Sequence, residues 1–294
     1  MSRVIVFGAS GLLGASLVPA LAGRGHDVLA QGRGEGAALR LDPLDADALA
    51  RAFETHRPNA IVNLIAATNV DQCEEQPVLA WRANVAVVEA LAGAIARRGD
   101  GRPHLVHVST DQVYDGPGPH AEAAVQPINV YGLSKYAGEL LAERVGATVL
   151  RTNFFGRSHC PSRTSFSDWL VASLRDARPI TVFDDVLFSA LHLQSLCDVI
   201  AAAIERRPAG VFNAGCRDGI SKAGFALSLA RKLSLSTAAV KVGTSSDVAL
   251  RARRPLDMTL DVSRIERALQ MSCPSMDAEI ERTAKEYSDV QASQ

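Results

Sequence analysis

A glycine-rich turn near the N-terminus constrains the fold of this chain more than any other feature. It reads Gly8-Ala9-Ser10-Gly11-Leu12-Leu13-Gly14 and stands between a short apolar run, residues 3–7, and a longer one, residues 12–22. A strand that turns through glycines into a helix presents backbone N–H groups to an anion. We therefore predict that the turn binds the pyrophosphate of a dinucleotide. The predicted binding residues are Gly8, Ser10, Gly11, Leu12, Leu13 and Gly14.

The first half of the chain continues in the same rhythm. Further apolar runs of strand length occupy residues 27–30, 60–65, 104–108 and 148–150, and helical patterns occupy residues 46–56, 78–97 and 130–145. Strands that alternate with helices are typical of β-α-β units and a parallel sheet. We predict an α/β protein in which residues 1–155 form a Rossmann-like, doubly wound, dinucleotide-binding domain.

The pattern loosens after residue 155. We expect helices near residues 168–175, 194–206 and 221–233, and strands at residues 180–183 and 211–213. These elements predict a smaller, discontinuous substrate lobe over residues 156–294, with segments near 180–214 returning to the first domain. The last dozen residues are polar from Lys285 onward, and we expect them to fray.

Composition excludes several classes of protein. Of 294 residues, 47% are hydrophobic and 21% are charged, with a net charge of −1. This balance fits neither a disordered polymer nor a membrane protein. The chain has no overall positive field that would attract nucleic acid or anionic lipid, so we expect a small-molecule substrate. The opening apolar run is too short for a signal peptide or a membrane span, which predicts a cytoplasmic protein.

The cysteines and histidines show no ligand pattern. Five scattered cysteines without a Cys-x-x-Cys pair indicate core thiols rather than a disulfide framework. The seven histidines include no pair at helical spacing. We predict no metal site.

Tyr131 and Lys135 are four residues apart in a predicted helix and so share a face. A neighbouring ammonium favours phenolate and lowers a tyrosine pKa from about 10. Such a tyrosine can protonate a carbonyl oxygen during reduction. The chain has 26 arginines and only five lysines, so a residue present only for its charge would usually be arginine. The pair therefore predicts a catalytic Tyr131 with Lys135 as its partner.

Two strand ends add further candidates. Gln31-Gly32-Arg33 follows the second strand, where a carboxylate would bind the ribose of NAD. Because an arginine there offers a fork of donors to a 2′-phosphate, Arg33 favours NADP(H), with NAD(H) still possible. Thr110 follows the strand at residues 104–108, at the edge where parallel sheets bind ligands. Its hydroxyl would hydrogen-bond the reacting oxygen.

Several motifs together resemble one family. They are Gly8–Gly14, Val70-Asp71-Gln72-Cys73-Glu74, Asn84, Ser109–Tyr114, Tyr131–Glu139 and Leu150-Arg151-Thr152-Asn153. They resemble extended short-chain dehydrogenases/reductases of the dTDP-4-dehydrorhamnose reductase type. The resemblance implies NADPH-dependent reduction of the C4 ketone of a nucleotide-diphosphate 4-keto-6-deoxy sugar, with Thr110, Tyr131 and Lys135 as catalytic residues.

The resemblance also implies roles for other residues. Asp42 would hold the adenine, although a helix-capping turn explains it equally well. Ala66 and Ala67 would pass close to the cofactor, and Tyr131 and Lys135 would contact it too. Asp111, Asn153 and Arg254 would bind the substrate, Arg254 through a diphosphate. Asn84 would either hold the loop after the strand at residues 104–108 or satisfy a buried backbone group.

Three alternatives to the reductase prediction follow from related families. Dehydratases carry Thr-Asp-Glu where this chain has Thr110-Asp111-Gln112, and loss of the second acid disfavours dehydration. An NAD-dependent sugar-nucleotide epimerase would be expected to carry an acidic residue near Arg33. A non-catalytic NADP-binding regulatory subunit, like methionine adenosyltransferase β, stays open. A homodimer through the helices at residues 78–97 and 130–145 is also expected from the family.

Overall fold

The computed structural model describes residues 2–32, 34, 37–99 and 101–292. Its largest feature is a seven-stranded parallel sheet of order β11-β6-β5-β4-β1-β2-β3. The strands are β1 (Arg3–Phe7), β2 (Asp27–Gly32), β3 (Leu39–Arg40), β4 (Ala60–Asn63), β5 (His104–Val108), β6 (Thr148–Thr152) and β11 (Gly210–Ala214). The predicted α/β, doubly wound fold is confirmed.

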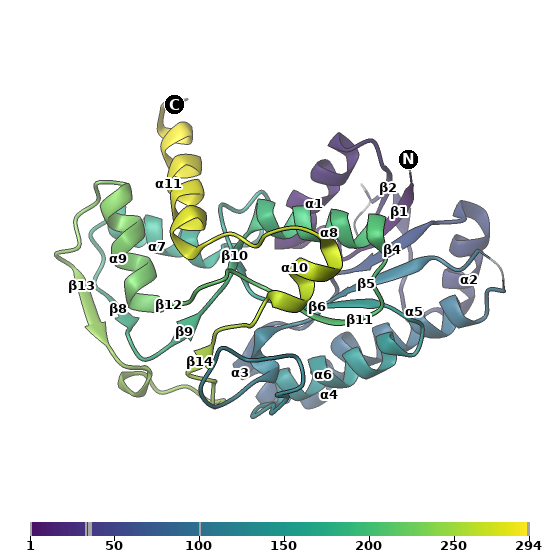
Figure 1. Ribbon diagram of the computed structural model, residues 1–294, viewed down its shortest axis with the longest axis horizontal. Helices are drawn as coiled ribbons and strands as arrows, with labels where there is room; N and C mark the ends of the chain where they lie inside the picture. Colours follow the sequence, from purple (N-terminus) through teal and green to yellow (C-terminus); the bar gives the residue numbers. More distant parts are fainter. Residues whose placement is uncertain (1, 33, 35–36, 100, 293–294) are drawn as a thin grey trace.

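Helices cover both faces of this sheet (Figure 1). One face packs against α1 (Leu12–Gly23) and α8 (Leu193–Arg206), and the other against α2 (Ala46–His56), α5 (Val87–Ala96) and α6 (Val130–Glu143). Successive side chains of a strand point to opposite faces. Val4 and Val6 accordingly pack in the α1 and α8 layer, while Ile5 and Phe7 pack in the layer of α2 and α5. An apolar strand buried on both faces explains the uninterrupted run at residues 3–7.

The helix expected over residues 78–97 is broken into three parts. These are α4 (Pro77–Trp81), a π-helical turn (Arg82–Ala86) and α5. The π-helical turn holds Asn84, whose buried side chain accepts from the Ala67 amide at 2.8 Å and donates to the Ser134 hydroxyl at 2.9 Å. Such turns widen a helix by one residue and re-aim a side chain. A Cβ on Gly138 would lie 2.3 Å from the Asn84 carbonyl oxygen, so α6 packs directly against this turn.

The same segment, Pro77–Ala96, is long and apolar enough to cross a membrane by length and composition. Half of its most apolar window is buried inside the fold. A core helix of this kind passes the same test, so the segment is weak support for a membrane span.

A second group of elements extends beyond the carboxyl ends of the large sheet's strands, at the left of Figure 1. Its small sheets pair β7 (Phe154–Phe155) with β10 (Leu191–His192), and β8 (Ile180–Phe183) with β13 (Val240–Gly243). A third combines β9 (Leu187–Phe188), β12 (Ile220–Ser221) and β14 (Asp257–Met258). The helices here include α7 (Phe166–Arg175) and α9 (Lys222–Lys232). Thus β11 lies in the large sheet beside β6, whereas β8 lies outside it.

Four further short elements lie before the C-terminal helix. They are α3 (Val70–Glu75), a 3-10 turn at Asp111–Val113, another at Ser245–Asp247, and α10 (Ser263–Leu269).

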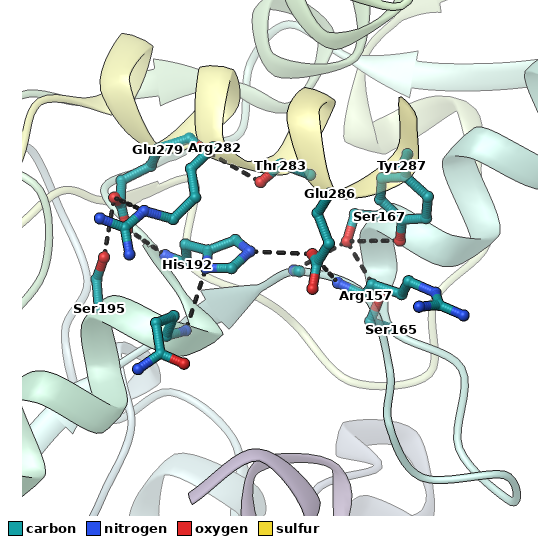
Figure 2. A network of polar contacts seen from close by, with 12 residues as sticks. Arg157, Ser165, Ser167, His192, Ser195, Glu279, Arg282, Thr283, Glu286 and Tyr287 are labelled. Atoms are coloured by element: carbon teal, nitrogen blue, oxygen red, sulfur yellow. Dashed lines mark hydrogen bonds and ion pairs between the residues drawn. The ribbon is translucent and has the colours of Figure 1, made fainter. Parts of the chain in front are cut away.

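The C-terminal helix α11 (Met276–Ala292) corrects the prediction that residues from Lys285 onward fray, as far as Ala292; residues 293 and 294 lie outside the described residues. Ile280, Ala284 and Tyr287 are buried at helical spacing, together with the polar side chains of Glu279 and Thr283. Figure 2 shows the polar contacts that fix this helix. Glu279 accepts from the Ser195 hydroxyl at 2.9 Å, and Glu286 accepts from the Arg157 amide at 2.9 Å and contacts His192 Nε2 at 3.1 Å.

Glu286→Gln should destabilise the protein near neutral pH. Burial raises the pKa of Glu286, but hydrogen bonds from His192 and the Arg157 amide together lower it below its usual value. A carboxylate with a lowered folded-state pKa contributes stability above its unfolded pKa and loses it as pH falls through the folded value. We expect a loss of about 1–2 kcal/mol in urea unfolding at pH 7, shrinking below pH of about 4.5.

The matched control is Glu281→Gln on the same helix. Glu281 forms an exposed ion pair with Lys232, and such pairs contribute about 0–1 kcal/mol. Equal stability of the Glu286→Gln and wild-type proteins at pH 7 would contradict the role given to this contact.

Candidate active site

The glycine-rich turn joins β1 to α1 as predicted. Gly8 has a φ of +78°, which favours glycine, and a Cβ on Gly14 would lie 2.4 Å from the Ala9 carbonyl oxygen. Gly11 is the N-cap of α1 and provides no side-chain hydrogen bond to the first turn. The first-turn N–H groups, which include those of Leu12 and Leu13, therefore face outward without a side-chain cap. Beside them lies the backbone of Ser10, whose carbonyl accepts from Cys160 Sγ at 3.2 Å.

Gln31 supports this turn from the end of β2. Its side chain accepts from the Gly8 amide at 3.1 Å and donates to the Leu41 carbonyl at 2.9 Å. Arg33, which was predicted to select the cofactor, lies outside the described residues. Asp42 is exposed and accepts from the Leu44 amide at 3.0 Å, whereas Asp45 caps α2. Asp42 therefore shapes a turn before α2 without being the cap itself.

Ala66 and Ala67 follow β4 and are half-buried. Asn84 holds both backbone polar groups of Ala67, since its Nδ2 also donates to the Ala67 carbonyl at 3.1 Å. The segment is thus fixed close to the glycine-rich turn. A Cβ placed on Gly8 of that turn would lie only 3.0 Å from the Ile65 amide nitrogen. Of the two roles considered for Asn84, the first is wrong in detail, because the residue holds the segment after β4 and not the loop after β5.

Thr110, Asp111 and Tyr131 meet beyond the end of β5. The Thr110 hydroxyl lies close enough to the Tyr131 phenol to affect its pKa, and Thr110 Oγ1 donates to Asp111 Oδ1 at 3.3 Å. All three are buried. A hydroxyl, a phenol and a carboxylic acid in contact can hold and transfer a proton.

Lys135 lies one helical turn beyond Tyr131 and is also buried. Its Nζ donates to the Val108 carbonyl at 2.7 Å, and burial lowers its pKa to about 8 although Glu139 opposes the shift. The expected lowering of the Tyr131 pKa is not found here. Burial, with the Asp111 charge, raises the pKa of Tyr131 above its usual value, and the Thr110 hydrogen bond opposes this only in part. The physical reason is that the Lys135 ammonium is directed at a backbone carbonyl.

Asp111 is held from its other side by Asn153, whose Nδ2 donates to Oδ2 at 2.9 Å. Burial raises the pKa of Asp111 to about 6, against the opposing effects of Asn153 and Lys222. Lys222, at the start of α9, was not among the predicted site residues. Its rarity was the available signal, since it is one of only five lysines in the chain.

Asn153 and Lys222, the two neighbours of Asp111, line a cavity of about 1020 Å³. Its lining includes Gln112, Asn153, Phe166, Trp169, Lys222 and the stretch Ala252–Met258. Arg254 also lines it, paired with Asp71 at 2.9 Å, and the Nε of Arg254 is buried without a hydrogen-bond partner in the described part of the chain. Gln112 Oε1 is likewise buried and unpartnered there.

A buried ionic network adjoins Thr110 through its neighbour in the chain, Ser109. Ser109 donates to Glu139, and Glu139 accepts two hydrogen bonds from Arg151, at 3.0 Å from Nε and 2.6 Å from Nη2. Arg151 Nη1 also donates to the Tyr114 hydroxyl at 2.8 Å. That hydroxyl in turn donates to Asn213 Oδ1 at 2.6 Å. The network joins α6, β6 and β11 directly beneath the loop that carries Thr110.

The five cysteines are buried and unpaired, in agreement with their interpretation as core thiols. Across residues 2–32, 34, 37–99 and 101–292, no three His, Cys, Asp or Glu side chains gather in a group that could hold a metal ion.

Comparison with known proteins agrees with this geometry. The family model described as "RmlD substrate binding domain" matches residues 2–289. The chain belongs to this RmlD family. A dTDP-4-dehydrorhamnose reductase of Streptomyces griseus is 33% identical over 273 residues, which cover 89% of this chain and 86% of the relative. The predicted resemblance is confirmed.

Two further similarities bear on activity. The crystal structure of dTDP-4-dehydrorhamnose reductase from Bacillus anthracis in complex with NADP has a TM-score of 0.86 and 25% identity, with 97% of this chain and 99% of that chain covered. The rat methionine adenosyltransferase 2 subunit beta is 27% identical over 289 residues, with 90% of this chain and 81% of the relative covered. This chain is thus similar both to proteins named as reductases and to a protein named as a subunit of another enzyme.

Proposed function

We propose that this protein is an NADPH-dependent reductase that acts on the keto group of a nucleotide-diphosphate 4-keto-6-deoxy sugar. One observation carries the proposal. The buried side chains of Thr110 and Tyr131 lie beside Asp111, and Asp111 is connected through Asn153 to a cavity large enough for a sugar nucleotide. The similarity to reductases of the RmlD family, one of them in complex with NADP, supports it.

The β1–α1 turn fits a dinucleotide. Gly14 is too close to the Ala9 carbonyl for any side chain, and α1 begins without a side-chain cap, as an anion-binding helix start requires. Backbone groups of Ser10, Leu12 and Leu13 would hold the pyrophosphate, Asp42 the adenine side, and Arg33 a 2′-phosphate. Ala66 and Ala67 would allow close approach, and Tyr131 and Lys135 would contact the nicotinamide end. The bound cofactor would supply hydride.

Within this chain, Tyr131 would donate a proton to the oxygen of the ketone as that oxygen becomes an alkoxide. Thr110 would orient the same oxygen, since its hydroxyl already contacts Tyr131. Lys135, whose ammonium donates to the Val108 carbonyl, would hold the nicotinamide ribose, and solvent would reprotonate the phenolate that remains on Tyr131. Asp111, Asn153 and Arg254 would bind the substrate. Because Gln112 occupies the place of a second acid, elimination of water is not supported.

The test is NADPH oxidation, followed by absorbance, with dTDP-4-keto-6-deoxyglucose as substrate. Turnover with NADPH preferred to NADH supports the proposal and the role of Arg33. Binding of NADPH without turnover on a panel of keto sugar nucleotides would favour a regulatory subunit, as the similarity to methionine adenosyltransferase subunits suggests. Cofactor that survives gel filtration would favour an epimerase.

We also propose that the protein pairs with a second copy through α4 and α6. The two helices lie side by side and expose Val78, Trp81, Leu133 and Leu140, with Val78 82% exposed. Burial of such a surface stabilises association. Sedimentation should report twice the chain mass of 31.2 kDa, and Trp81→Glu should shift it toward one chain. A wild-type monomer at micromolar concentration would contradict this.

A further inference from the structure

The ammonium of Lys222 is held in an unusual place for a cation. It lies over the ring of Phe188 at 3.5 Å from the centroid and over the ring of Phe166 at 4.6 Å. These cation–π contacts fix the position of Nζ but use none of its three N–H donors. No acceptor hydrogen-bonds Nζ among the residues that the structure describes, and Lys222 lines the cavity. The ammonium is therefore oriented toward the cavity with donors to offer a ligand.

Asp111 is the charged group that faces Lys222. Each of the two shifts the pKa of the other, and burial lowers the pKa of Lys222 to about 8 against the effect of Asp111. Asp111 in turn contacts Thr110, which contacts Tyr131. Lys222 is thus the lining residue that faces Asp111, the neighbour of Thr110. The arginines of the lining, Arg253 and Arg254, pair with Asp115 and Asp71 instead of with Asp111.

We propose that Lys222 binds a ring hydroxyl of the substrate's sugar, together with Asp111 on the other side of that hydroxyl. This inference rests on the proposed function and goes beyond it in naming the group that reads the sugar. A hydroxyl can accept from the ammonium and donate to the carboxylate at once, which neither a ketone nor a phosphate can do. A phosphate here would also lie against the negative charge of Asp111.

The test compares two ligands that do not react, dTDP-glucose and dTDP, by titration calorimetry. In Lys222→Met, the Kd for dTDP-glucose should rise about 10- to 100-fold, because a charge-assisted hydrogen bond is lost. The Kd for dTDP should stay within about twofold of wild type, since dTDP has no sugar beyond the diphosphate. Lys241→Met, at an exposed lysine on β13, is the matched control and should change neither value.

The outcomes separate the possibilities. Equal weakening of both ligands would place Lys222 on the phosphate and overturn the inference, and an unchanged dTDP-glucose Kd would overturn it too. If Lys222→Met fails to fold, judged by NADPH binding, Lys222→Gln keeps a donor and should show a smaller rise for dTDP-glucose alone. A wild-type protein that binds dTDP-glucose without turning over any keto sugar refutes the proposed function, while the calorimetric result for Lys222 still stands.

Discussion

Replacement of Tyr131 by phenylalanine should lower kcat for NADPH-dependent reduction by about 10²- to 10⁴-fold. The variant loses only the hydroxyl that contacts Thr110, so the fold and the glycine-rich turn keep their contacts. The Kd for NADPH, measured by fluorescence, should change little. Because burial raises the pKa of Tyr131, the phenol is protonated at neutral pH and suited to proton donation in reduction.

Tyr136→Phe is the control for this experiment. Tyr136 lies on the same helix, is half-buried, and its ring contacts Arg151. Removal of its hydroxyl should leave kcat within about twofold of wild type. Unchanged turnover in Tyr131→Phe, or an equal loss in both variants, would exclude Tyr131 as the proton donor.

Arg151→Met should have the largest effect on stability. Arg151 and Glu139 are almost fully buried, and removal of one partner leaves an unpaired charge in the interior. Such losses cost about 3–5 kcal/mol, which urea unfolding followed by circular dichroism would measure. Burial and the charge of Glu139 raise the pKa of Tyr114 while Arg151 lowers it, for a net value of about 12, so Tyr114 stays neutral and adds no second negative charge beside Glu139.

The double variant Glu139→Gln with Arg151→Met tests the mechanism of that loss. It should be less destabilised than the sum of the two single variants, because neither charge is then left alone. Arg178→Met removes one partner of the exposed pair with Asp176 and should cost about 0–1 kcal/mol. A similar small cost for Arg151→Met would show that the network contributes little to folding.

Local patterns predicted the features that depend on neighbours in sequence. The glycine-rich turn, the Tyr131 and Lys135 pair, and every strand of the large sheet except the short β3 follow from short-range spacing and apolar runs. The π-helical turn at Arg82–Ala86 could not be predicted in this way. Its apolar residues repeat as in a continuous helix, and the turn exists because Asn84 reaches Ala67 and Ser134, which are distant in sequence.

Long-range contacts also explain the other differences. Lys222 joins the site through Asp111, Phe166 and Phe188, none of which its local sequence identifies. Residues from Lys285 onward have a polar composition, yet Tyr287 is buried. Its hydroxyl is satisfied there because it donates to Asp168 at 2.6 Å. Lys135 was expected to lower the Tyr131 pKa, but the carbonyl of Val108 attracts its ammonium instead. Sequence spacing places two side chains on one face of a helix, but it does not determine which hydrogen-bond partner each side chain has in the folded protein.

The most direct test of the central claim is the rate of NADPH oxidation by the wild-type protein with dTDP-4-keto-6-deoxyglucose. We predict turnover that depends on both ligands, is faster with NADPH than with NADH, and yields the nucleotide sugar with a hydroxyl in place of the C4 ketone. Tight NADPH binding with no oxidation on this or any other keto sugar nucleotide would contradict it, and the intact Thr110 and Tyr131 contact would then belong to a binding protein.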